Sequence, residues 1–358
     1  MAKIRSVVVE PKPAMGRINP NKIGKILHLP YNAAGQMSTQ ANALKLIGAN
    51  ASFCDYYESA YKYPTDIPSP IRNIPKANRE KVMLKFAQNC ASKYDIFHFH
   101  FGQTFTGYSY SDLPLLRSMG KKMVMNYWGT QIRRLSVAKK NNPFAIVKQT
   151  NEKLILSRLH TVSKFVDSAI VADHELLEYI NGYFRKIYLV KASVNQNLIS
   201  PAYPNIHNKR PIVVHAPTHR GVKGTEFILQ AVENLKKSIK FDFVLIEGMT
   251  NEEALNNYKK ADIIVDQLRL GSYGTVSIEN MLFGKPVITY IRDDLKSKYP
   301  TDLPIISANP HTIESVLSKL LINPKLRYET GIKSRKYAEK YHLPERIARQ
   351  LVSVYNNL

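Results

Sequence analysis

The chain has 358 residues, a length that suggests about two domains of ordinary size. A hydrophobic share of 44% and a charged share of 22% exclude a disordered chain, a collagen and a coiled coil. Two cysteines without a nearby histidine pair argue against a disulfide framework or a zinc cluster and favour a reducing cytoplasm. No apolar run approaches the ~18 residues that span a bilayer, and the first residues lack a secretory signal, so we expect no membrane-spanning segment.

The charge is strongly positive. The 51 basic and 28 acidic side chains give a formal net charge of +23, and residues 1–200 carry 28 basic and 12 acidic side chains. Such a field attracts phosphorylated metabolites, anionic lipid headgroups or nucleic acid, because long-range attraction depends on sign rather than identity. The alternative is a basic surface that serves solubility alone.

The first part of the chain alternates between apolar runs and helical segments. Residues 1–23 contain three prolines and no helical period, so we expect an extended N-terminal arm. Short apolar runs then predict buried strands at 25–30, 51–56, 95–100, 121–128, 168–173 and 186–191. Helical segments are expected at 76–93, 143–159 and 174–180. Repeated strand and helix predict a parallel sheet and an N-terminal Rossmann-like domain over 24–195.

The pattern breaks and then restarts. Polar residues and prolines predict a linker at 196–210. A second Rossmann-like domain over 211–340 follows, with strands at 211–217, 241–248, 262–268 and 285–291 and helices at 224–237, 251–261 and 275–284. A last helix within 341–358 is expected to cross back toward the N-terminal domain. In such an α/β protein, ligands bind at the carboxyl ends of the parallel strands, so a cleft between the domains is the expected site.

The segment DQLRLGSYGTVSIENMLFGKPVITYI, residues 266–291, places a glycine-containing turn between a strand and a helix. Glycines let the backbone approach a ligand, and the free amides at a helix start attract phosphate. Glu279 lies about one turn into that helix, where its carboxylate could accept hydrogen bonds from a ribose diol. The alternative is an ordinary turn with a solvated glutamate.

Within this segment, GSYGTVSIENMLFGKPVI resembles the nucleotide-sugar signature of retaining glycosyltransferases with the GT-B fold, especially glycosyltransferase family 4. The resemblance implies that Glu279 holds the nucleotide ribose. The family has another glutamate eight positions earlier that contacts the donor sugar, and Gly271 stands there in this chain. The donor-binding residues implied by the resemblance are Gly271, Ser272, Tyr273, Gly274, Thr275, Val276, Glu279 and Thr218.

A second stretch, VVHAPTHRGVKGTEFILQAV at 213–232, is similar to the basic loop with which the family grips the donor diphosphate. Lys223 stands at the position of the family lysine, and Thr218 at that of the family arginine. Arg220 is the nearby candidate for a replacement charge. The resemblance therefore implies that Lys223 and Arg220 are the catalytic residues, since cations stabilise the charge that develops on the departing diphosphate.

The N-terminal half resembles the acceptor side of the family more weakly. Its motifs are LPYNAAGQMSTQANALKLIGA at 29–49 and NYWGTQIRR at 126–134, where tryptophan replaces a family histidine. That tryptophan either stacks on a sugar ring or belongs to the core. The implied acceptor and cleft residues are Gly35, Gln36, Trp128, Gly129, Arg133 and His100.

His98 and His100 alternate along one strand and point to one face. No third ligand lies at a convincing spacing, so we expect structural or cleft-lining histidines and no metal site. The carboxylates likewise show no pair typical of a glycosidase.

The resemblance implies a metal-independent hexosyl-type glycosyltransferase of the retaining class with no cofactor. Its partners would be a nucleotide-sugar donor, a glycan or lipid-linked acceptor and an anionic membrane surface. Specific nucleic-acid binding is not expected, because no known binding motif is present. The expected location is the cytoplasm, with peripheral binding at the inner face of the cell membrane. The alternative is a catalytically impaired GT-B-like subunit that binds a glycan or a partner.

Overall fold

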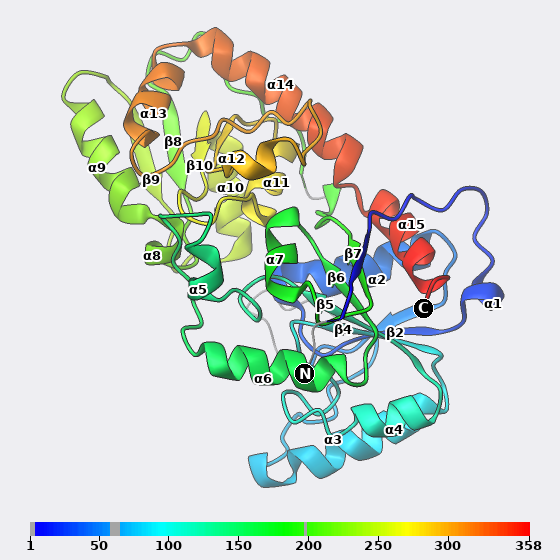
Figure 1. Ribbon diagram of the computed structural model, residues 1–358. Helices are drawn as coiled ribbons and strands as arrows, with labels where there is room; N and C mark the ends of the chain where they lie inside the picture. The colour runs from blue at the N-terminus through cyan, green and yellow to red at the C-terminus, as the bar shows by residue number, and fades with distance from the viewer. Residues whose placement is uncertain (1–3, 58–64, 197–198) are drawn as a thin grey trace. The chain divides into compact units, whose positions relative to one another are not determined.

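The computed structural model describes residues 4–57, 65–196 and 199–358, and the chain separates into two compact units (Figure 1). The N-unit comprises Met1–Arg134, Gln149–Ser193 and Pro344–Leu358. The C-unit comprises Leu135–Lys148 and Val194–Leu343. The linker expected at 196–210 includes Asn197 and Leu198, which lie outside the described residues.

The N-unit is built on a seven-stranded parallel sheet with the order β1-β7-β6-β5-β4-β2-β3. Its strands are β1 (Val7–Val9), β2 (Ile26–Leu29), β3 (Ala51–Phe53), β4 (Ile96–His100), β5 (Lys122–Tyr127), β6 (Ser168–Val171) and β7 (Lys186–Leu189). The six strands predicted from the apolar runs are confirmed. Within the extended N-terminal arm expected at 1–23, Val7–Val9 form β1, which pairs in register with β7 at an edge of the sheet.

Helices connect these strands in the order that the alternation predicted. They are α1 (Pro20–Ile23), α2 (Gln36–Leu46), α3 (Lys76–Ala91), α4 (Leu113–Ser118), α6 (Glu152–Ser163) and α7 (Leu177–Ile180), with short 3-10 turns at Ala33–Gly35 and His174–Leu176. The helix predicted over 143–159 begins only at Glu152. Asn151 stops it there, because its side chain accepts the backbone amide of Leu154 at 3.0 Å and caps the helix.

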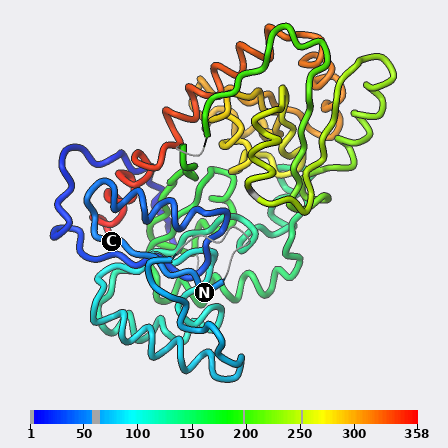
Figure 2. The backbone as a smooth tube through the Cα atoms, turned by 180° about the vertical axis from the view of Figure 1, so that it is seen from behind, coloured from blue at the N-terminus to red at the C-terminus, as the bar shows by residue number. Residues whose placement is uncertain are grey.

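The last helix, α15 (Pro344–Tyr355), covers the N-unit sheet beside α2 (Figure 1). Figure 2 shows this C-terminal helix among the first segments of the chain. The apolar face predicted from its sequence is confirmed, since all its members are buried: Ile347, Leu351, Val354 and Tyr355. They pack with residues of β2, β4, β5, β6 and β7 in one core cluster, so the end of the chain completes the core of its first domain.

The C-unit holds a four-stranded parallel sheet with the order β11-β10-β8-β9. Its strands are β8 (Ile212–His215), β9 (Asp242–Leu245), β10 (Ile263–Val265) and β11 (Val287–Ile288). Its helices are α5 (Leu135–Ala138), α8 (Arg220–Lys223), α9 (Thr225–Lys236), α10 (Asn251–Lys260), α11 (Thr275–Leu282), α12 (Asp293–Lys296), α13 (Ile313–Leu321) and α14 (Pro324–Tyr341). Every strand predicted for the second domain is present.

Each unit thus has the strand and helix alternation of a Rossmann-like domain, with loops gathered at the carboxyl ends of the strands. Among the described residues, no helix combines the length and apolar character that crossing a membrane requires.

Candidate functional site

In the C-unit, the basic loop after β8 is fastened to the end of β10. The backbone amide of Leu268 donates to the carbonyl of Lys223 at 3.0 Å. Gly224, with φ +75°, joins α8 to α9, and a Cβ there would lie 3.2 Å from the Cβ of Leu268. A left-handed glycine is therefore needed for this close approach.

This fastening buries an ion pair between the two loops. Lys223 Nζ lies 2.5 Å from Asp266 Oδ1 and 3.0 Å from Gln267 Oε1, and all three side chains are buried. Burial raises the pKa of Asp266, but the Lys223 charge and the hydrogen bonds from Lys223 and Ser277 outweigh it and hold that pKa below its usual range. Lys223 keeps one further proton for another acceptor.

Asp266 also reaches the start of α11. Its Oδ2 accepts the hydroxyl of Ser277 at 2.6 Å, and Ser277 lies 3.2 Å from the hydroxyl of Thr289. The Lys223–Asp266–Ser277 chain joins the two sequence motifs through buried hydrogen bonds. The basic loop after β8 and the glycine turn are thus parts of one site.

The glycine turn leads directly into α11. Gly274 is the N-cap residue, and no side chain caps the helix. Apart from its two neighbours in the chain, no atom of the described residues lies within 4 Å of a Cβ built at Gly274. Thr275 and Val276 follow in the first turn, both half-buried, and that turn contains no acidic side chain. Uncapped amides beside open space form a site for an anionic group.

Glu279 lies one turn further along α11. Its carboxylate is half-buried, and within the described residues no hydrogen bond reaches it. Burial and the nearby Asp266 charge raise the pKa of Glu279 to about 7. A half-buried acceptor of this kind is suited to a hydroxyl donor such as a ribose diol.

Gly271 stands where the family that the sequence resembles has a glutamate, and the structure gives a reason for the glycine. Its φ is +84°, and a Cβ there would lie 2.4 Å from Cγ of Arg292. Arg292 is buried and bonds Asp294, with Nη2 to Oδ2 at 2.7 Å. The side chain of Arg292 therefore fills the space that a longer residue at 271 would need.

The other turn residues are held by neighbours within the C-unit. Ser272 is buried, and its carbonyl accepts the side-chain amide of Gln267. The hydroxyl of Tyr273 lies 3.2 Å from that of Tyr337 and 3.1 Å from Nε2 of His342. These bonds fix the shape of the turn.

Arg220 and Thr218 lie on the surface. Arg220 forms an exposed ion pair with Glu247, with Nε to Oε1 at 2.7 Å, and the pair keeps the pKa of Glu247 below its usual range. Thr218 is exposed. The buried Lys223 and the exposed Arg220 are therefore unequal candidates for a catalytic cation.

Sequence reasoning did not select Arg269, which lies beside the same loop. It donates to the carbonyl of Gly221 at 3.3 Å, pairs with Glu226 at 2.7 Å and covers the ring of Phe227. Its own carbonyl accepts the side-chain amide of Asn142 at 2.7 Å. The sequence signal that could have identified Arg269 was its place directly after the strand predicted at 262–268. Its contacts could not be predicted, because its partners lie far from it in the sequence.

In the N-unit, most of the expected acceptor residues have structural partners. Gly35 has φ +70° and precedes α2, and Gln36 exchanges two hydrogen bonds with the backbone of Ser193. Gly129, with φ +116°, lies against the guanidinium of Arg133. Arg133 forms a buried ion pair with Glu175, at 2.7 Å between Nη2 and Oε2. These residues shape the loops at the carboxyl ends of the strands.

His100 belongs to a buried network on the face covered by α15. Its Nε2 lies 3.0 Å from Nδ1 of His28, and Tyr355 Oη lies 3.1 Å from Nε2 of His28 and 2.8 Å from Nδ1 of His98. Burial lowers the pKa of His28 to about 3 and those of His98 and His100 well below their usual value. The three rings are therefore neutral.

One nitrogen of each of the three rings could serve as a metal ligand, since such atoms lie within 4.8 Å of one another. The rings of His98 and His100 are stacked, however, with centroids 4.3 Å apart and an interplanar angle of 16°. Nearly parallel rings do not aim their in-plane lone pairs at one point. The arrangement favours a hydrogen-bonded network, and His28, which the strand spacing did not reveal, supplies its third ring.

Polar groups without a partner surround this network. Among the described residues, buried atoms that make no hydrogen bond include Nε2 of His98, Nδ1 of His100, both side-chain polar atoms of Asn126 and Nε1 of Trp128. Trp128 follows β5 directly and is half-buried. Its ring stacks on that of His100, with centroids 6.4 Å apart, so Trp128 extends the histidine network to the end of the strand. Such groups mark a place for water or a hydroxyl-rich ligand.

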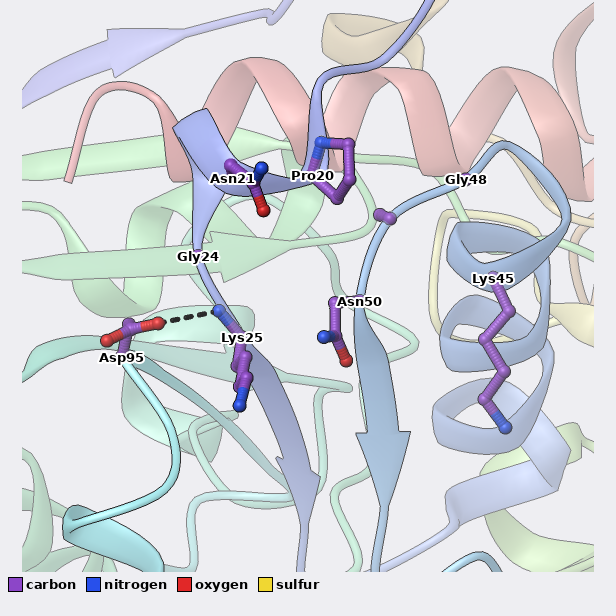
Figure 3. A pocket seen from close by; sticks show the side chains of 9 residues that line it. Pro20, Asn21, Gly24, Lys25, Lys45, Gly48, Asn50 and Asp95 are labelled. Carbon is purple, nitrogen blue, oxygen red and sulfur yellow. Dashed lines mark hydrogen bonds between the residues drawn. The ribbon is translucent and has the colours of Figure 1, made fainter.

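A pocket of about 440 Å³ lies at the opposite, amino end of β2 and β3 (Figure 3). Lys25, Lys45 and Asn50 line it from three different segments, and Asp95 accepts the backbone amide of Lys25 at 2.7 Å. Ligands of parallel α/β domains bind at the carboxyl ends of the strands. This pocket is therefore no part of the candidate site.

No protein-family model matches the sequence. A search of curated proteins finds no match either.

Solved structures show a clear likeness in fold. Sucrose-phosphate synthase from Thermosynechococcus elongatus has a TM-score of 0.62 and 16% identity over 93% of this chain and 98% of that chain. HepE of Anabaena, solved with UDP, has a TM-score of 0.61 and 12% identity over 93% of this chain and 100% of that one. TarM of S. aureus has a TM-score of 0.56 and 13% identity over 77% of this chain and 58% of that one.

At these identities the likeness shows the fold: the chain has the GT-B architecture of two Rossmann-like domains, as predicted from its sequence.

Proposed function

We propose that the chain is a glycosyltransferase that binds a nucleotide-sugar on its C-unit and transfers the sugar to an acceptor. The observation that carries this proposal is the Lys223–Asp266–Ser277 chain, which joins a basic loop to an uncapped helix start one turn before Glu279. Helix amides and a cation suit a diphosphate, and a carboxylate without a hydrogen-bond partner suits a ribose.

In the proposed reaction, the bond between the sugar C1 and the diphosphate oxygen breaks, and a bond from C1 to an acceptor hydroxyl oxygen forms. The departing phosphate takes the hydroxyl proton on the same face, so configuration is retained and no separate base is needed. The amides of α11 and the free proton of Lys223 stabilise the developing phosphate charge. The reaction as proposed uses no metal and no cofactor.

The N-unit is the proposed acceptor side, with a glycan or a lipid-linked glycan as acceptor. Its support is the group of buried polar atoms without partners at the carboxyl end of β4 and β5. Among the neighbours, HepE has been solved with UDP-glucose, which makes that molecule the first donor to test.

Calorimetry with UDP and UDP-glucose tests the donor site. We expect the wild-type chain to bind, and Glu279→Ala to weaken binding at least tenfold, because the ribose hydroxyls then lose the carboxylate that accepts their hydrogen bonds. Glu233→Ala, at an exposed position on α9, is the matched control. Absence of binding across a panel of nucleotide-sugars would overturn the proposal, and full affinity in Glu279→Ala would remove the role of this residue.

A second candidate is a binding subunit without catalytic activity. The observation in its favour is Arg292, which fills the space that a glutamate at position 271 would need. Nucleotide-sugar binding with neither hydrolysis nor transfer over days would favour this candidate, whereas slow hydrolysis would favour the enzyme.

A further inference from the structure

A groove of about 840 Å³ opens on the C-unit between the loop at 301–306, α13 and α14. Figure 1 shows α13 and α14 as consecutive helices in that unit. The volume is in the range of sites for small organic molecules. Its lining comprises Thr301, Asp302, Leu303, Pro304, Ile306, Val316, Lys319, Leu320, Leu326, Thr330, Lys333, Lys336, Tyr337 and Lys340.

The floor of the groove is apolar. Leu303, Ile306, Val316 and Leu326 are half-buried, so each leaves part of its side chain accessible, and Leu320 is buried behind them. These residues come from three segments that are separate in sequence, so the apolar surface is continuous only in the folded unit. A chain of methylene groups would gain by covering it.

The rim of the groove is basic. Lys333, Lys336 and Lys340 follow one another at i, i+3 and i+7 on α14, which places them on one face of the helix, and Lys319 approaches from α13. Asp302 is the one acidic residue of the lining, and it is paired with Lys340 at 2.9 Å. Within the described residues, no ion pair engages the other three lysines.

We propose that this groove binds an anionic phospholipid of a bilayer, with an acyl chain on the apolar floor and the phosphate among the lysines. The basic rim and the apolar floor together select this occupant. A neutral apolar chain would leave the three unpaired lysines without a partner, and a small soluble phosphate would not cover the apolar floor. The net charge of +23 draws the whole chain toward the same anionic surface.

Co-sedimentation of the full chain with vesicles tests the proposal. Vesicles of phosphatidylcholine with about one third phosphatidylglycerol are compared with phosphatidylcholine alone. Lys333→Glu combined with Lys336→Glu should lower the partition coefficient on anionic vesicles at least tenfold, since each basic residue near such a surface contributes about fivefold. The variant's thermal unfolding should match that of wild type, because both side chains are exposed.

The matched control reverses two exposed lysines outside the groove, Lys209→Glu with Lys260→Glu, and changes the net charge by the same amount. We expect less than a threefold loss from this control. Equal losses in the two double variants would mean that diffuse charge, and not the groove, binds the surface, and would overturn the proposal.

A competition experiment distinguishes binding of a whole phospholipid from binding of a phosphate group alone. Glycerol phosphate at millimolar concentration should leave the partition unchanged, and a water-soluble short-chain phosphatidylglycerol below its micellar concentration should reduce it. Leu303→Ser should weaken binding of that short-chain lipid at least threefold. Equal competition by glycerol phosphate would show a site for phosphate alone and would also overturn the proposal.

Discussion

At the residue scale, the side chain of Arg292 occupies the space that any side chain at position 271 would need. Placing the family glutamate at position 271 would impose a side chain on a backbone with φ +84° and drive its Cβ to 2.4 Å from Arg292. We predict that Gly271→Glu lowers the free energy of unfolding by roughly 2 kcal/mol or more. Denaturant titration measures it.

Combining Gly271→Glu with Arg292→Ala separates the steric clash with Arg292 from the cost of the positive φ. Removal of the long side chain should recover part of the loss, while the cost of the positive φ remains. A Gly271→Glu protein as stable as wild type would show that the turn adapts, and would remove this explanation for the absence of the glutamate.

Lys223 forms a buried pair with Asp266, so replacing it alone would lower the stability of the fold as well as any turnover that depends on Lys223. Lys223→Met should cost about 3–5 kcal/mol of stability, because it leaves the Asp266 carboxylate buried without its cation. Adding Asp266→Asn should recover much of that loss, since the buried charge is removed. Denaturant titration of both variants and of Asp266→Asn alone measures the coupling.

If Lys223 also holds the diphosphate, the stable double variant should still transfer sugar at least a hundredfold more slowly than wild type. Near-normal turnover in that variant would assign Lys223 to the fold alone. The Lys223 charge holds the pKa of Asp266 below its usual value, so the stability contributed by the pair is present above about pH 4 and is lost as the pH falls below it.

Glu279 predicts a pH dependence of donor binding. With a pKa of about 7, its carboxylate is mostly protonated at pH 6 and mostly ionised at pH 8. Because the ionised form accepts ribose hydroxyls better, the affinity for the nucleotide-sugar that binds should rise about tenfold across this range. Calorimetry at pH 6, 7 and 8 measures it, and Glu279→Gln should give a flat profile.

The stability of the ligand-free protein should depend on pH in the opposite direction from its affinity for the donor. The raised pKa means that the folded state holds the Glu279 proton more tightly than the unfolded state does, so its contribution to stability falls as the pH rises from 4.5 to 7. In Glu279→Gln this trend should disappear, which separates the titration of Glu279 from that of other groups.

The two segments that the structure joins into the proposed donor site could be selected from the sequence, because glycines after a strand and a carboxylate one turn into a helix are local patterns. It did not reveal that Arg292 fills the space beside Gly271 or that Asp266 is shared by Lys223 and Ser277. Both arrangements depend on side chains brought together by the sheet, which no local spacing encodes.

At the scale of the element, the buried hydroxyl of Tyr355 adds hydrogen bonds to the apolar packing of α15 on the N-unit sheet. Tyr355→Phe would leave Nε2 of His28 and Nδ1 of His98 without their partner. We predict a loss of about 1–3 kcal/mol in the free energy of unfolding. Denaturant titration measures it, and Tyr328→Phe, at an exposed position on α14, is the control.

The elements themselves followed from local patterns with instructive exceptions. Ten apolar runs predicted ten strands, but β1 was missed because Val7–Val9 is short and lies at an exposed edge. The helix expected from 143 starts at Glu152, because the asparagine cap outweighs the apolar spacing before it. His98 and His100 were expected to share a face; their partners His28 and Tyr355 could not be found by spacing.

At the scale of the whole molecule, chain order and domain membership differ. Residues 135–148 belong to the C-unit although both flanking segments belong to the N-unit, and α15 belongs to the N-unit although it follows the whole C-unit. The stability of the first domain therefore depends on the last helix. The stability of the second does not, because its sheet and its own core lie entirely within Leu135–Lys148 and Val194–Leu343.

This predicts an asymmetric response to truncation. Removing residues 344–358 uncovers the sheet face of the N-unit that Ile347, Leu351 and Val354 pack against, a loss of several buried aliphatic side chains at about 1.5–3 kcal/mol each. Scanning calorimetry of the truncated chain should retain one unfolding transition, that of the C-unit, and lose the other. Because the proposed donor site lies within the C-unit, nucleotide affinity should persist. If both transitions vanished together, the two units would be one cooperative body and this division of the chain would be wrong.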